Sequence, residues 1–151
     1  EETGDEFNIE MKPFDGCVYD KGAEDIHGKS KKVISKYTPE KKAMVDFVHF
    51  LNGRGQLSIA GYNSRFDMEF IIALFKRNGL NYWTYFNYYD VDVFALVKIL
   101  DLQGRHDGKN SKKLTAICNT MGVKLKNAHD AMADIKATKK LYKKIMKKYM
   151  R

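Results

Sequence analysis

Hydrophobic and polar residues alternate along this chain in short blocks, and their spacing switches between that of a strand and that of a helix. The stretch from Phe7 to Met11 alternates in this way up to Pro13, which predicts a half-buried strand. Two more extended segments are predicted over residues 57–62 and, from a run of aromatic residues, over residues 82–89. Helical segments separate these blocks.

Apolar residues three and four positions apart predict five helices. The first has Thr38 as its N-cap and Pro39 in its first position, and it ends at the stop signal Asn52-Gly53. The others are predicted over residues 67–79, over 93–100, over 112–121 with Ser111 as N-cap, and from 131 onward. Because strands and helices alternate and no linker or repeat divides the chain, the pattern predicts one α/β domain over residues 1–151.

The composition supports a packed core, since 44% of the 151 residues are hydrophobic and 13% are aromatic. No apolar run approaches the roughly 18 residues that a membrane span needs. An intrinsically disordered protein and a membrane-spanning one are therefore excluded, and no membrane partner is expected. Cys17 and Cys118 lie far apart without the spacing of zinc ligands, which argues against a zinc module and a disulfide-stapled fold. A reducing compartment, and hence a cytoplasmic location, is expected.

Positive charge is concentrated at one end of the chain. The formal net charge is +8, and residues 139–151 contain seven basic residues and no acid. The lysines recur in pairs every four residues beside an apolar stripe, which predicts an amphipathic helix with a basic face. Two interpretations stay open: a solvated face that complements the helix dipole, or a surface that attracts phosphates.

The aromatic run over residues 82–89 also has two interpretations. Single-stranded nucleic acid is held partly by stacking on aromatic rings. Aromatic residues are also favoured in strands, where they pack against flanking helices. Packing in the core is the favoured interpretation.

Four segments combine carboxylates, a histidine or tight turns: residues 1–4, 60–67, 89–96 and 128–134. His129 and Asp134 lie five positions apart across a loop-to-helix junction, so the imidazole can lie near the carboxylate. Mg²⁺ or Mn²⁺ needs carboxylates from several elements, and Asp67 can supply another. The alternative is that both aspartates complement helix dipoles and that His129 is an ordinary polar residue.

The order and spacing of these segments resemble the DEDD 3′→5′ exonucleases of the histidine subclass, which include the proofreading subunit of replicative polymerases, ribonuclease T and oligoribonuclease. Glu1-Glu2-Thr3-Gly4 matches the end of that family's Asp-x-Glu-x-Thr-Gly motif. Residues 62–67 match its His/Tyr-Asn-x-x-Phe-Asp motif, and residues 129–134 match its His-x-Ala-x-x-Asp motif. Ile26-His27-Gly28 resembles the family's loop near the substrate terminus, and Asp92 stands where the family has an aspartate before a helix.

The resemblance implies a ribonuclease H-like fold, with a mixed β-sheet flanked by helices, and hydrolysis assisted by two Mg²⁺ or Mn²⁺ ions. It implies that His129 is the general base, a role that suits the ordinary pKa of histidine. The metal ligands that it implies are Glu1, Asp67 and Asp134. The residues that it implies for substrate binding are Thr3, Gly4, His27, Asn63 and Phe66.

The expected function is a metal-dependent 3′→5′ exonuclease that releases nucleoside 5′-monophosphates from single-stranded nucleic acid. The expected partner is a single-stranded 3′ end, of DNA rather than RNA. Two alternatives stay open: a catalytically silent nucleic-acid-binding module of the same fold, and a proofreading subunit that acts with a DNA polymerase.

The amino-terminal motif departs from the family pattern. The aspartate that the family has two residues before Glu1 is absent, and after Gly4 the chain runs directly into a segment that resembles the family's third strand. We therefore expect a polypeptide that carries an apolar strand before Glu1 and a further segment of roughly 15 to 25 residues between Gly4 and Asp5.

Overall fold

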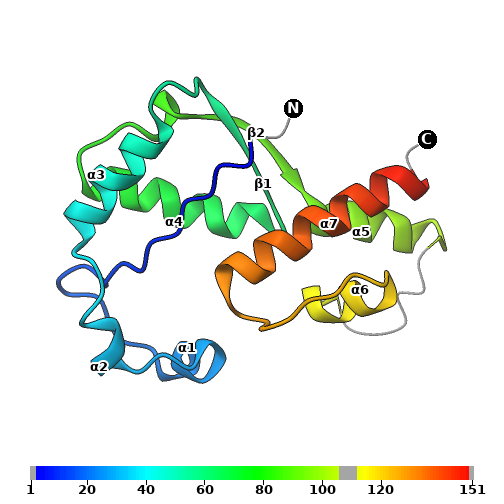
Figure 1. Cartoon of the computed structure of the whole chain (residues 1–151), viewed down its shortest axis with the longest axis horizontal. Helices are drawn as coiled ribbons and strands as arrows, with labels where there is room; N and C mark the ends of the chain where they lie inside the picture. Colours follow the sequence, from blue (N-terminus) through cyan, green and yellow to red (C-terminus); the bar gives the residue numbers. More distant parts are fainter. Residues whose placement is uncertain (1–2, 106–111, 150–151) are drawn as a thin grey trace.

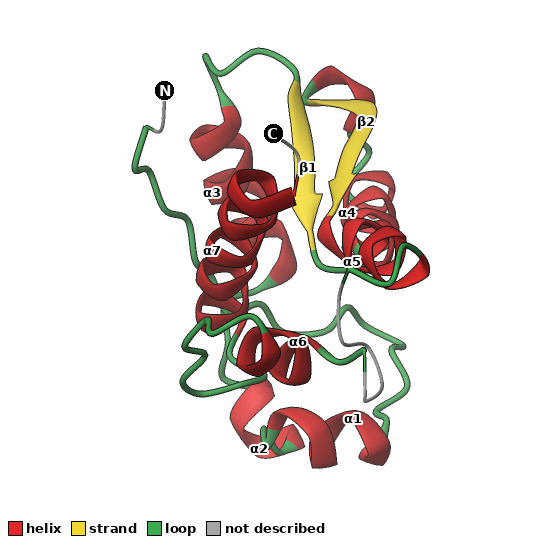
Figure 2. Ribbon diagram, turned by 90° about the vertical axis from the view of Figure 1, so that its right-hand side faces the viewer, coloured by secondary structure: helices red, strands yellow, loops and turns green. Residues whose placement is uncertain are grey.

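A two-stranded parallel sheet lies at the middle of the structure, and helices pack around it. The computed structural model describes residues 3–105 and 112–149. In chain order its elements are α1 (Lys21–His27), α2 (Lys31–Ile34), α3 (Glu40–Leu51), β1 (Leu57–Gly61), α4 (Ser64–Arg77), the 3-10 helix η1 (Tyr82–Thr84), β2 (Phe86–Asp92), α5 (Val93–Leu102), α6 (Leu114–Thr120) and α7 (Ala131–Tyr149). In the view of Figure 1, α3 and α4 lie to the left of the strands and α5, α6 and α7 toward the right, and Figure 2 shows α3 and α7 on one side of the sheet and α4 and α5 on the other. The predicted α/β class, with a sheet flanked by helices, is confirmed.

The two strands run in the same direction, so their carboxyl ends lie together (Figure 2). Gly61, at the end of β1, pairs with Asp92, at the end of β2. Along β1, half-buried residues alternate with exposed ones, as the sequence pattern predicts. Because α4 follows β1 and α5 follows β2, the amino ends of both helices start at the same edge of the sheet.

Two apolar clusters hold these elements together. One is centred on Phe75 of α4, which is fully buried and meets the rings of Tyr82 and Phe86 edge-on. It also includes Met44 and Leu51 of α3. The other cluster joins α5, α6 and α7 through Val93, Val97, Leu100, Ile117, Cys118, Met121, Val123, Ala137, Leu141 and Ile145. The buried residues of α7 recur every three or four positions, which explains why this segment is helical.

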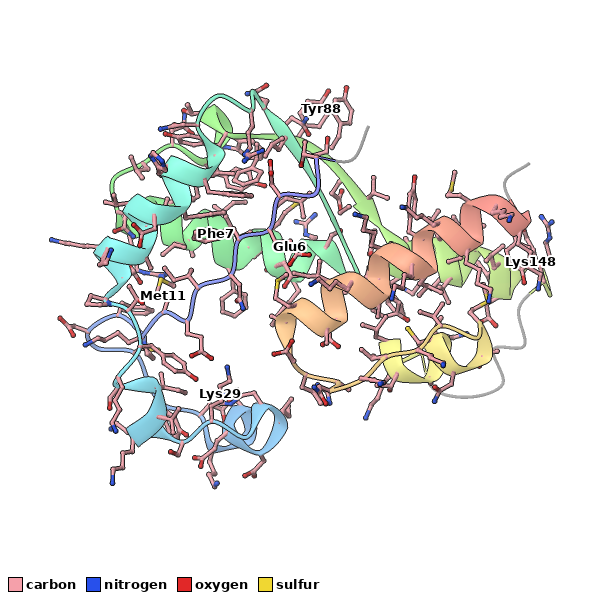
Figure 3. The ribbon with its side chains drawn as sticks, viewed as in Figure 1. Glu6, Phe7, Met11, Lys29, Tyr88 and Lys148 are labelled. Carbon is pink, nitrogen blue, oxygen red and sulfur yellow. The ribbon has the colours of Figure 1, made fainter. Side chains whose placement is uncertain are left out.

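The segment from Phe7 to Met11 is extended, and the prediction of a strand there is wrong. Inward and outward residues alternate as expected, but its pairing is a single bridge between Met11 and Thr38. The Phe7 ring stacks on Phe47 and lies 5.2 Å from the Phe50 ring, both on α3 (Figure 3). A helix therefore buries the apolar face of this segment, so the alternation arises without a strand ladder.

Several helix boundaries differ from the prediction. Thr38 exchanges backbone hydrogen bonds with the extended segment, so Pro39 becomes the N-cap and α3 begins one residue late. Helix α4 begins at Ser64, one turn before the predicted start at Asp67. Helix α6 is shorter than predicted, and its expected cap Ser111 lies outside the described residues.

Helices α1 and α2 are short elements that were not predicted. Neither contains a buried residue, so their sequences carry no apolar stripe that would mark them. Both views place them at the lower end of the molecule, under α3 and α4 in Figure 1 and under α6 in Figure 2. Within the described ranges, no helix combines the length and apolar character needed to cross a membrane.

The aromatic run over residues 82–89 divides between core and surface. It forms η1 and the first part of β2, so the prediction of a wholly extended segment is wrong for its first turn. Tyr82 and Phe86 are buried and stack on each other, as the core interpretation predicts. Tyr88 and Tyr89 are exposed, since the register of β2 shifts between its pairings with Leu57 and Ile59.

Candidate active site

A cavity of about 940 Å³ opens at the carboxyl ends of the strands, next to Tyr62 and Leu114, which pack against the cluster that joins α5, α6 and α7. This is the edge of a parallel sheet at which α/β proteins usually bind ligands. Four parts of the chain contribute to it: α1, the junction of β1 and α4, the region of α5 and α6, and the start of α7. Its lining consists of Asp25, Ile26, Tyr62, Asn63, Phe94, Lys112, Lys113, Leu114, Thr115, Ala128, His129 and Asp134.

His129 reaches the cavity from a tight turn before α7. Its φ is +73°, a conformation that side-chain-bearing residues rarely adopt. Asp130 then caps the helix, because its carboxylate accepts a hydrogen bond from the backbone N–H of Ala133 at 2.9 Å. Asp134 follows within the first turns of α7 and lines the same cavity. The structure thus brings together the histidine and the carboxylate that the sequence places five positions apart.

Asn63 and Asp67 stand at the junction of β1 and α4. Asn63 lines the cavity and has a φ of +65°, so it also lies in the left-handed region. The Asp67 carboxylate bends back over the strand end, where its Oδ2 lies 3.5 Å from the position that a Cβ on Gly61 would occupy. A Cβ at this position would be in ordinary van der Waals contact with the carboxylate, so Asp67 lies directly beside the end of β1.

Both aspartates lie in surroundings that penalise their charge. Burial raises the pKa of Asp67, and burial also raises the pKa of Asp134, although His129 offsets part of that second rise. In the described chain, neither carboxylate forms an ion pair with a lysine or arginine. Carboxylate oxygens are donors that hard divalent cations prefer, so the chemistry of both residues suits such an ion.

The third predicted ligand, Glu1, lies outside the described residues. Among the residues that the structure describes, no group of three or more His, Cys, Asp or Glu side chains could by itself hold a metal ion. Of the three predicted ligands, Asp67 and Asp134 are thus the two that lie within the described residues.

The other predicted substrate residues lie elsewhere. Thr3 is exposed, and its Oγ1 accepts a hydrogen bond from the backbone N–H of Asp5. Gly4 is also exposed and has a φ of +77°. The described lining of the cavity includes neither residue.

His27 and Phe66 also lie outside that lining. The Nδ1 atom of His27 accepts a hydrogen bond from the backbone N–H of Lys29 at 3.0 Å, while its neighbour Ile26 lines the cavity. Phe66 is 58% exposed and packs against Phe70, one turn further along α4. Of the predicted substrate residues in the segment 62–67, Asn63 therefore lines the cavity and Phe66 does not.

Several residues that line the cavity were not predicted from the sequence, above all Phe94 and Lys112. Phe94 packs its ring against Tyr62, with centroids 5.4 Å apart. The Tyr62 hydroxyl donates a hydrogen bond to the backbone carbonyl of Lys112 at 2.5 Å, and burial raises the pKa of this tyrosine to about 12. These contacts join residues about 30 to 50 positions apart, so no local pattern signals them; Phe94 does lie within the segment 89–96 that the sequence analysis singled out.

Comparison with known proteins agrees with this picture. The fold and the cavity define an α/β protein with carboxylates and a histidine at the carboxyl edge of its sheet. The exonuclease family model RNase_T matches residues 1–142, so the chain belongs to this family of the DEDD superfamily, which has a ribonuclease H-like fold. Membership indicates a nuclease, that is a hydrolase, and exonucleases of this family typically use divalent metal ions. A search of curated proteins found no match.

Proposed function

We propose that this protein is a metal-dependent 3′→5′ exonuclease of the histidine subclass, which removes nucleoside 5′-monophosphates from single-stranded nucleic acid, preferentially DNA. One observation carries the proposal: in a chain of the exonuclease family, His129, Asp134 and Asn63 line one cavity, and the Asp67 carboxylate lies over the adjacent strand end. We propose a cytoplasmic location because the two cysteines are unpaired.

Asp67 and Asp134, together with Glu1, would hold two Mg²⁺ or Mn²⁺ ions. When bound, such ions lower the pKa of a water molecule and stabilise negative charge on the leaving oxygen. His129 is exposed at the mouth of the cavity, so it can accept the proton of the attacking water and pass it to solvent.

The rest of the lining suits a nucleotide at the end of a strand. Phe94, Tyr62 and Leu114 form an apolar part of the wall, against which a base can pack. Lys112 and Lys113 add basic side chains beside it, of which Lys112 forms an ion pair with Asp101, and a phosphate can compete for such cations. Single-stranded nucleic acid is commonly held by this combination of aromatic side chains and cations.

The test is digestion of 5′-labelled single-stranded DNA and RNA of equal sequence, with Mg²⁺, Mn²⁺ or EDTA. We expect a ladder that shortens from the 3′ end, keeps its 5′ label and is abolished by EDTA, with DNA shortened faster than RNA. An oligonucleotide blocked at its 3′ terminus is the matched control and should stay intact. Internal cleavage, or release of the 5′ label as a mononucleotide, would contradict the proposal.

The same assay separates the two alternatives. A catalytically silent binding module would retain labelled DNA on a filter without shortening it in any metal. A proofreading subunit would shorten DNA by itself and would become more processive when a DNA polymerase is added. An unchanged length distribution of the products after addition of a polymerase would favour an enzyme that acts alone.

A further inference from the structure

Helix α4 begins without a side-chain cap of its own. Asn63 occupies the N-cap position with a left-handed backbone, and it makes no side-chain capping hydrogen bond. The backbone N–H of Asn63 is instead satisfied from the neighbouring strand β2. The turn that contains Asn63 and precedes Asp67 is therefore held by a hydrogen-bond acceptor from β2.

That group is the carboxylate of Asp92. Its Oδ1 accepts a hydrogen bond from the backbone N–H of Asn63 at 2.8 Å and another from the backbone N–H of Phe94 at 2.9 Å. Asp92 pairs with Gly61 in the sheet, so it lies beside the point where β1 turns into α4. One oxygen atom thus ties the start of α4 to the start of α5.

Asp90 holds the next residue of the same helix. Its Oδ2 accepts a hydrogen bond from the hydroxyl of Ser64, which is completely buried. Two carboxylates of β2, two residues apart, therefore hold two consecutive residues at the amino end of α4. Acidic groups at this end also complement the helix dipole. Asp67 stands three residues after Ser64, within the turn that these contacts hold.

We infer that Asp92 is a positioning residue for the candidate metal site, an inference that rests on the proposed function. Asp92 does not belong to the described lining of the cavity. Through the Asn63 N–H, it sets the turn from which Asn63 faces the cavity and Asp67 bends back over Gly61. When a residue that orients metal ligands without contacting the ion is lost, metal binding typically weakens by about 10- to 100-fold.

Two substitutions separate positioning from direct metal binding. Asp92→Asn keeps an oxygen that can accept both N–H groups but removes the charge, whereas Asp92→Ala removes the acceptor. Asn81→Ala is the matched control, because Asn81 caps η1 by accepting a hydrogen bond from the N–H of Trp83, away from the cavity. The variants are compared in the full chain.

The measurements are Mn²⁺ binding by calorimetry, hydrogen exchange of the Asn63 amide, and Tm. We expect Asp92→Ala to weaken Mn²⁺ binding by about 10-fold or more and to expose the Asn63 amide, and Asp92→Asn to preserve both. Asn81→Ala should lower Tm while leaving Mn²⁺ binding intact.

Unchanged Mn²⁺ binding in Asp92→Ala would overturn the inference, as would equal losses in Asp92→Asn and Asp92→Ala, which would show that the charge itself binds the ion. Absence of Mn²⁺ binding in the wild type would also overturn it. A wild type that binds Mn²⁺ but fails to shorten DNA would contradict the proposed function alone, because none of these three readouts requires turnover.

Discussion

Asp67 and Asp134 carry an energetic cost that a bound cation can remove. Burial raises the pKa of both groups above the ordinary value of 3.8. A carboxyl group whose pKa is higher in the folded protein than in the unfolded chain binds more protons when folded, so the free energy of unfolding falls as the pH rises through that window. Without metal at neutral pH, both groups are charged and both lower stability.

The first prediction is that Asp67→Asn and Asp134→Asn each abolish most turnover without destabilising the fold. Loss of a residue that binds the metal directly should lower turnover by more than about 100-fold, which is the upper range for residues that only orient the metal ligands. Both variants should keep or raise the Tm of the wild type in EDTA at pH 7, because each removes a charge that burial disfavours. Steady-state rates in Mg²⁺ and thermal melts measure the two effects.

Asp46→Asn is the control for that pair, since Asp46 lies on α3 in an ion pair with Lys42 and should leave the rate unchanged. The gain in Tm should shrink as the pH is lowered below the raised pKa values, where the wild-type carboxyls become neutral as well. Near-normal Mg²⁺-dependent rates in either variant would remove that aspartate from the site.

The second prediction concerns His129. His129→Ala should lower turnover by about 10²- to 10⁴-fold, the usual range for a general base, and should abolish the fall in rate at acid pH. His49→Ala serves as the comparison, because His49 is exposed on α3 and lines no part of the described cavity. If the fall in rate at acid pH persists in His129→Ala, another group accepts the proton.

At the scale of elements, α7 joins the candidate site to a basic surface. It spans 19 residues, roughly 27 Å, from the mouth of the cavity to Lys148 at its far end (Figure 3). Ala137, Leu141 and Ile145 are buried, so most of its lysines lie on the outer face. Some of these lysines have contacts within the protein, such as Lys136 with Glu6. The helix thus offers a row of cations that leads away from His129.

The third prediction tests whether this row meets phosphates. Lys140, Lys144 and Lys148 are replaced together by glutamine, and binding of single-stranded DNA is measured against salt concentration. We expect weaker binding and a salt slope that decreases by about 0.7 for each lost contact, with turnover at saturating substrate unchanged. The control variant replaces Lys31, Lys32 and Lys36, in and after α2, by glutamine. It removes the same amount of positive charge from another part of the surface. Equal slopes in the wild type and the α7 variant would mean that these lysines are only solvated.

The elements also show what the sequence could predict. Helices α3, α5 and α7 and strand β1 were predictable because each buries one face at its own period. Helices α1 and α2 contain no buried residue, and the segment from Phe7 to Met11 has the alternation of a strand but pairs through a single bridge. His129 and Asp134 were predictable because they are close in sequence, whereas Phe94 and Lys112 reach the cavity only through tertiary packing.

At the scale of the whole molecule, stability is distributed unevenly. The two apolar clusters bury parts of α3 to α7, while α1 contributes Asp25 and Ile26 to the cavity without a buried residue of its own. Lys29, just after α1, forms an ion pair with Glu10 at 2.6 Å. Surface ion pairs of this kind add little stability. One wall of the cavity is thus held far more weakly than the others.

The fourth prediction follows from that difference. Amides of α1 should exchange with solvent much faster than those in the middle of α7, which should exchange only on global unfolding. Hydrogen exchange followed by mass spectrometry measures both segments in one sample. Glu10→Gln should accelerate exchange in α1 without changing α7. Equal protection of α1 and α7 in the wild type would show that α1 is part of the cooperative core.

The chain has a single tryptophan, Trp83, which lies on η1 with 47% of its surface exposed. Its ring meets the buried ring of Tyr82 edge-on, with centroids 4.9 Å apart. Trp83 is also absent from the described lining of the cavity. Its fluorescence emission is therefore a built-in optical signal for melting of the Phe75 cluster, and it can be read while a DNA strand occupies the cavity.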